Sequence, residues 1–164
     1  MGNIKKFMLE AKARKELGAE QYYMLREEFL KAFNSICSSL IGDNDGRKLV
    51  RQMKEFKDKM WLDSLFEFLG SASLIVSVWR SGTYSLKETI AGCVVGTILA
   101  TVAYLKKRQD RASYNDTKDE LIDYVVGKAN KLKDEQLGIG VEENIPLNDT
   151  ARVVYRDAAD DLVY

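Results

Sequence analysis

A chain of 164 residues with 46% hydrophobic content is long enough to bury a core of its own, and we expect one domain of ordinary size. Its 25 basic and 25 acidic residues cancel, which excludes attraction of nucleic acid by the overall charge but leaves local basic patches open. The sequence has no histidine, and its cysteines, Cys37 and Cys93, are far apart. The commonest general base and the ligands of a zinc site are therefore missing, so we predict no enzyme, no metal and no cofactor.

Proline and glycine positions favour helices through most of the chain. The only proline is Pro146, so the preceding residues include no obligatory helix breaker. The glycines gather where turns are expected, at Gly18, residues 42–46, Gly82 and residues 138–140. We therefore predict an all-α fold.

The clearest amphipathic helix is predicted from Ala19 to Ile41. Large apolar side chains recur there at steps of three and four, which places them on one stripe of the helix. The stripe consists of Tyr22, Leu25, Phe29, Phe33, Ile36 and Leu40. Because the spacing is heptad-like, we predict that this stripe supplies a core or coiled-coil seam for assembly of a homo-oligomer.

A basic helix is predicted next, beginning after the turn at residues 42–46 and running toward Trp61. Leu49, Met53, Phe56 and Met60 form its apolar stripe. Most of its remaining surface is basic, with Arg47, Lys48, Arg51, Lys54, Lys57 and Lys59.

Two apolar blocks follow, Ser64–Trp79 and Thr89–Leu105. A bilayer core about 30 Å thick needs roughly 20 helical residues, so both blocks are marginal in length. Aromatic side chains stand at the block ends, where a membrane interface would favour them: Trp61, Trp79, Tyr84 and Tyr104. We predict a transmembrane helical hairpin. The alternative is a soluble hairpin buried between other helices.

The charges that flank these blocks are asymmetric. Six Lys or Arg lie between Arg47 and Lys59, and the second block is followed by Lys106, Lys107, Arg108 and Arg111. The connecting loop carries only Arg80 and Lys87. By the positive-inside rule, we predict a protein of the cell inner membrane with both termini in the cytoplasm.

The second apolar block carries small residues on one edge, namely Gly92, Gly96, Ala100 and Ala103. Such an edge lets a neighbouring backbone approach closely in a membrane, where packing holds helices together. We therefore predict a helix-packing site there, with the partner helix left open.

The first apolar block has a polar face, formed by Asp63, Glu67, Gly70, Ser71, Ser73 and Ser77 and interrupted by Leu74 and Val78. A carboxylate left in hydrocarbon costs about 2.5 kcal/mol or more, so this face should contact protein or water. If several hairpins assemble, we expect an ion path lined by Asp63, Glu67, Ser71, Leu74 and Val78. Alternatively, Glu67 lies at headgroup level and pairs with a lysine of the preceding helix.

After the hairpin, the pattern predicts a cytosolic amphipathic helix that starts near Asn115 or Asp116 and ends before Gly138. The last segment is open between a short helix or strand packed on a partner and a solvated acidic tail. The predicted organisation is a cytosolic helical region (1–60), the transmembrane hairpin (61–107), a cytosolic helix (108–137) and a C-terminal tail (138–164).

This layout resembles that of SLATT domains, two-transmembrane effectors of bacterial antiphage systems that accompany nucleotide-polymerising enzymes. The resemblance is one of architecture and covers residues 20–137. It implies an oligomeric membrane pore that is gated by a nucleotide or oligonucleotide ligand and depolarises an infected cell. The phosphate contacts would then be Arg47, Lys48, Arg51 and Lys54, or the cations from Lys106 to Arg111. The alternative is that each of these cations is an ordinary membrane-flanking residue.

We therefore expect an oligomeric, ligand-gated, ion-conducting membrane effector in antiphage defence, with the bilayer, further copies and a nucleotide as partners. Two other classes stay open. One is a phage or viral membrane protein, such as a holin or an internal virion protein, which would act without a ligand. The other is a soluble helical adaptor.

Overall fold

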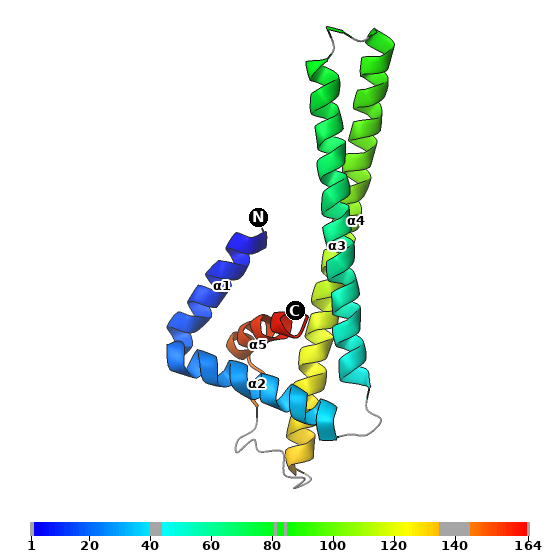
Figure 1. The fold of residues 1–164 in the computed structure, drawn as a ribbon. Coiled ribbons are helices and arrows are strands. Elements are labelled where there is room, and N and C mark those ends of the chain that lie inside the picture. The colour runs from blue at the N-terminus through cyan, green and yellow to red at the C-terminus, as the bar shows by residue number, and fades with distance from the viewer. Residues whose placement is uncertain (1, 40–43, 81, 84, 135–144, 164) are drawn as a thin grey trace. The chain divides into compact units, whose positions relative to one another are not determined.

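The computed structural model describes residues 2–39, 44–80, 82–83, 85–134 and 145–163, and every regular element within them is an α-helix (Figure 1). The prediction of an all-α fold is confirmed. Predictions that concern Leu40, residues 42–43, Tyr84 and residues 138–140 lie outside the described residues. The helices are α1 (Gly2–Leu17), α2 (Ala19–Ser39), α3 (Asp45–Trp79), α4 (Leu86–Asp134) and α5 (Asp149–Asp161).

The two long helices each join segments that have different compositions. Helix α3 has 35 residues and unites the basic helix with the first apolar block. Helix α4 has 49 residues and continues through Asn115 and Asp116, so the prediction of a helix start at these positions is wrong. The sequence between Gly96 and Gly127 contains neither proline nor glycine, and nothing there interrupts the helical hydrogen bonds.

The chain divides into two compact units. Residues 1–53 and 116–164 form the first, which we call the terminal unit because it contains both chain ends. Residues 54–115 form the second, which we call the hairpin unit. Helices α3 and α4 each contribute one part to both units. The terminal unit thus combines the predicted N-terminal region with the segments predicted as a separate helix and a tail.

The core of the terminal unit lies between α2 and α5. The rings of Phe29 and Tyr155 stack with centroids 5.1 Å apart, and both side chains are fully buried. The Tyr22 hydroxyl donates a hydrogen bond of 3.0 Å to an Asp157 carboxylate oxygen. Helix α1 adds Ala13 to this core, and Gly18, with φ of 80°, provides the left-handed turn that separates α1 from α2.

The apolar stripe of α2 is therefore a core within one chain. Its described members, Tyr22, Leu25, Phe29, Phe33 and Ile36, are at most 9% exposed. Of the two roles predicted for this stripe, a core or a seam for assembly, the core is the one found within the chain, and assembly of a homo-oligomer stays a prediction. The periodicity predicts a buried stripe, and α5 of the same chain packs on α2.

Helix α5 turns the C-terminal segment into part of this core. Asn148 caps the helix by accepting a 2.8 Å hydrogen bond from the backbone N–H of Ala151. The Asn130 amide binds both backbone groups of Ile145, at 2.9 and 3.2 Å, and so joins the segment before α5 to α4. The buried face of α5 consists of Ala151, Val154, Tyr155, Ala158 and Ala159. Of the two readings of the tail, the solvated one is therefore excluded for this segment.

Truncation of the α2–α5 stack tests this core. We expect Phe29→Ala to lower the free energy of unfolding of the terminal unit by about 3–5 kcal/mol, because it leaves a cavity against Tyr155. Hydrogen exchange of the α2 and α5 amides measures this loss. The control, Met24→Ala, changes a half-exposed side chain of the same helix and should change the free energy of unfolding by about 0.5 kcal/mol or less. Equal exchange in both variants would contradict the stack.

Alkaline pH should weaken the same core. Burial and the hydrogen bond to Asp157 raise the pKa of Tyr22 from 10.0 to about 12. The folded state thus keeps a proton that the unfolded chain releases, so this contribution to stability is full below about pH 10 and is lost as the pH rises through 12. We expect Tyr22→Phe to reduce the loss of stability between these pH values, as measured by denaturant unfolding. An unchanged pH dependence would contradict the assignment.

Candidate functional site

The outer surface of the hairpin unit is apolar and exposed. Helices α3 and α4 each contain a segment long and apolar enough to cross a membrane, and only 11% of each segment is buried. The exposed fraction reaches 69% for Ile75 and 57% for Ile98. A helix in the core of a soluble protein would be mostly buried, so this chain does not itself build the soluble bundle considered as the alternative.

The two helices of the hairpin unit lie side by side (Figure 1), and small residues let them approach closely. A Cβ atom added to Gly70 of α3 would lie 2.7 Å from the backbone nitrogen of Ala100 in α4. A Cβ added to Gly96 would lie 2.9 Å from the carbonyl oxygen of Gly70. Gly92 lies against the side chain of Ser77 rather than against backbone, and Ala103 is 4% exposed. The residues singled out for helix packing thus lie against α3 of the same hairpin.

The polar face of α3 also points toward α4. The Nζ atom of Lys107 lies 2.9 Å from an Oε atom of Glu67, and the two side chains are partly buried. Asp63 is 9% exposed, and its Oδ2 atom has no hydrogen-bond partner among the described residues. Leu74 packs on Gly96. These three residues are predicted to line a pore. Within the described chain Glu67 and Leu74 contact α4, and Asp63 is buried.

The other two predicted pore residues, Ser71 and Val78, are exposed. Glu67 pairs with a lysine of the following helix rather than of the preceding one. The partner was missed because sequence spacing relates residues within one helix but gives no register between two helices. The small residues Gly70, Ser73 and Ser77 of α3 were the available signal for that register, since they complement the small edge of α4.

Three hydroxyl groups of the apolar segments are satisfied within their own helices. Ser64, Ser71 and Thr97 each donate to the carbonyl oxygen four residues earlier, at 2.8, 2.9 and 2.8 Å. This bond lowers the cost of placing a hydroxyl in hydrocarbon, because the donor keeps a partner without water. These hydroxyls are therefore compatible with a lipid-facing surface.

Exposed aromatic rings mark both ends of the apolar surface. Trp61 and Trp79, near the two ends of the α3 segment, are 69% and 83% exposed. Tyr104, near the end of the α4 segment, is 54% exposed. Amphipathic rings at these positions suit the two interfaces of a bilayer.

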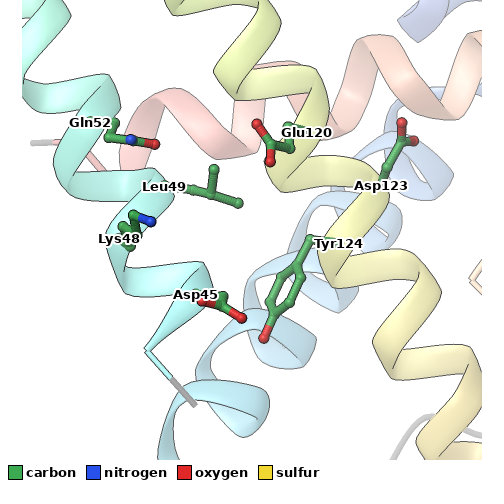
Figure 2. Close-up of a pocket in the computed structure, with 7 residues that line it drawn as sticks. All are labelled: Asp45, Lys48, Leu49, Gln52, Glu120, Asp123 and Tyr124. Carbon is green, nitrogen blue, oxygen red and sulfur yellow. The ribbon is translucent and has the colours of Figure 1, made fainter.

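A separate cavity of about 500 Å³ lies in the terminal unit, between the start of α3 and α4 (Figure 2). Figure 2 shows Leu49 pointing into it and the Tyr124 hydroxyl pointing toward Asp45. Three carboxylates and one ammonium line the cavity, so its charge disfavours phosphate. The lining residues are Asp45, Lys48, Leu49, Gln52, Glu120, Asp123 and Tyr124.

The cations predicted to contact phosphate are not gathered in this cavity. Lys48 lines it, whereas a guanidinium N–H of Arg47 donates to the carbonyl oxygen of Cys37 at 3.0 Å. Arg51 and Lys54 are exposed on the surface of α3. Comparisons of the chain with family models, curated proteins and solved structures found no match. The hairpin unit, with its exposed apolar surface and its partly buried ion pair, is the candidate functional site.

A disulfide across the hairpin tests its register. A Cβ added at Gly92 lies 3.3 Å from the Cβ of Ser77, close to the separation of about 3.5–4.5 Å in disulfides. In a chain with Cys37→Ser and Cys93→Ala, we expect Ser77→Cys and Gly92→Cys to cross-link on oxidation. Trypsin cuts after Arg80 and Lys87, so the linked peptides are found by mass spectrometry.

The matched control pairs Gly92→Cys with Ser71→Cys, which is exposed and more than one turn away along α3. This pair should give little intramolecular cross-link. Equal yields from the two pairs would show that α3 and α4 do not keep the described register.

Proposed function

We propose that this chain is a two-span protein of the inner membrane that assembles into a ligand-gated, ion-conducting pore, with membrane depolarisation in antiphage defence as its action. The observation that carries the proposal is the exposed apolar surface of the hairpin unit, which is bounded by aromatic rings and then by charges. Such a surface is stable in hydrocarbon and unstable in water. The SLATT-like layout supports the effector role.

The composition of the terminal unit supports the proposed topology. This unit contains residues from both sides of the hairpin, and α2 packs on α5 within it. Two segments that fold into one core must lie on the same side of a bilayer. The lysines and arginines beside the hairpin then favour the cytoplasmic side for both termini.

Conduction requires several copies, because one pair of helices cannot enclose a path. In this proposal the described arrangement is the closed form, in which Asp63 is buried and Glu67 pairs with Lys107 of α4. Opening separates the Glu67–Lys107 pair and turns the polar face of α3 toward a path shared by neighbouring hairpins. Carboxylates at the mouth of that path favour cations. The exposed cations Arg47, Lys48 and Arg51 of the terminal unit remain the proposed contact for a phosphate-bearing ligand.

Potassium flux from liposomes that contain the purified chain tests the closed form. Glu67→Gln removes one partner of the ion pair and leaves the Lys107 ammonium partly buried without its counter-ion. We therefore expect the variant to raise the resting flux several-fold. A potassium-selective electrode outside the liposomes measures it.

The control for this experiment is Glu55→Gln, which removes the same charge from an exposed position of α3. It should leave the flux at the wild-type level. Identical flux from all three proteins would remove Glu67 from the gate. High flux from the wild-type chain without any added ligand would instead favour a holin-like lytic protein.

A further inference from the structure

A band of basic side chains lies at the end of the hairpin unit opposite its tight turn. We call this band the basic collar. Three acidic residues, Glu55, Asp58 and Asp110, interrupt its seven cations, so it keeps an excess of positive charge, whereas the loop at the other end has Arg80 and Lys87 against Glu88. The basic collar consists of Lys54, Lys57 and Lys59 on α3, and Lys106, Lys107, Arg108 and Arg111 on α4.

The charges of the basic collar are spread around the helices. At about 100° per residue, the consecutive Lys106, Lys107 and Arg108 project in three directions from α4. Lys107 turns inward to Glu67, while Lys106, Arg108 and Arg111 are exposed. A single bound ligand is contacted by side chains that converge on one point. Charges that point outward in several directions instead match a surrounding layer of negative charge.

The basic collar also adjoins the apolar surface directly. Trp61 follows Lys59 on α3, and Tyr104 precedes Lys106 by two residues on α4. Both rings are more than half exposed, and the exposed apolar side chains lie on the far side of them. The order along the hairpin is thus cation, aromatic ring and hydrocarbon-compatible surface. A bilayer presents phosphate, interface and hydrocarbon in the same order.

We propose that the basic collar binds the phosphates of anionic phospholipids in the leaflet that faces the terminal unit. This inference rests on the proposed membrane insertion and adds a partner to it. Charge complementarity supplies the affinity, and the collar holds anionic lipids around the hairpin in preference to zwitterionic lipids. Removal of three exposed cations should abolish that preference without removing the hairpin from the membrane.

The two tryptophans of the chain allow each end of the hairpin to be measured separately. Trp79→Phe leaves Trp61, beside the basic collar, as the only tryptophan, and Trp61→Phe leaves Trp79 at the other end. Each protein is reconstituted into mixed vesicles of phosphatidylcholine and phosphatidylglycerol. Two vesicle preparations are compared, one with brominated phosphatidylcholine and one with brominated phosphatidylglycerol. Bromine on the acyl chains quenches the fluorescence of a tryptophan in contact with that lipid.

We expect brominated phosphatidylglycerol to quench Trp61 more strongly than its mole fraction in the vesicle predicts. The quenching of Trp79 should match that mole fraction. Replacement of Lys106, Arg108 and Arg111 by glutamine should reduce the quenching of Trp61 to the level that the mole fraction predicts. The matched control replaces Lys12, Lys15 and Lys31, exposed cations of the terminal unit, by glutamine. It removes the same charge and should keep the preference. High salt should weaken the preference in the wild-type chain.

The outcomes separate this proposal from the proposed function. If neither tryptophan is quenched by either lipid, the hairpin is outside the bilayer and the membrane function fails with it. If both are quenched but Trp61 shows no preference for phosphatidylglycerol, the hairpin inserts and the lipid site is overturned. Binding of a fluorescent single-stranded oligonucleotide in pure phosphatidylcholine vesicles, lost in the same triple variant, would assign the basic collar to nucleic acid instead.

Discussion

Apolar surface that its own chain does not cover is the constraint on which this structure depends. Side chains such as Phe68 and Ile75 are more than two-thirds exposed, and each would gain about 1.5–3 kcal/mol if it were removed from water. The gain summed over the hairpin unit is comparable to the whole stability of a typical domain. The surface therefore needs hydrocarbon or protein around it. The satisfied hydroxyls and the aromatic ends of the hairpin favour hydrocarbon.

Inside hydrocarbon, the two helices of the hairpin cannot be held together by the hydrophobic effect. Their contact depends on the absence of side chains at Gly70 and Gly96, which brings backbone against backbone. The Glu67–Lys107 pair adds a polar contact that is specific to one register. The same contact turns Glu67 toward α4, whereas Ser71 on the same face stays exposed. Packing within a single hairpin thus gives an outer surface that is compatible with lipid.

The terminal unit is stabilised differently, because its apolar core is buried away from water by the hydrophobic effect. Helices α2 and α5 were brought together by aromatic stacking and buried apolar faces, although more than a hundred residues separate Phe29 from Tyr155. The sequence pattern predicted that the α2 stripe is buried and that the chain is helical. It could not name the covering partner, because α5 is short and periodicity within one helix carries no information about distant segments.

Local sequence patterns also explain which of the other predictions agree with the structure and which do not. The spacing of small residues predicted the packing edge of α4. Its partner Gly70 was assigned to the polar face of α3, because a glycine can belong either to a polar face or to a helix-packing contact. Asn115 was read as a cap because it precedes an amphipathic pattern, yet the helix passes through it without a break. The flanking cations could be found from composition alone. The cavity near Lys48 could not, because it depends on which carboxylates of α4 face α3, and that is known only from the fold.

The most direct test of the account is flotation of the purified, detergent-free chain with liposomes in a density gradient, followed by alkaline carbonate washing. If hydrocarbon surrounds the hairpin unit, the protein will float with the vesicles and stay with them after the wash. Recovery of a dissolved monomer from the dense aqueous fraction would contradict the central claim. It would mean that the apolar surface of the hairpin unit is in contact with water and not with lipid.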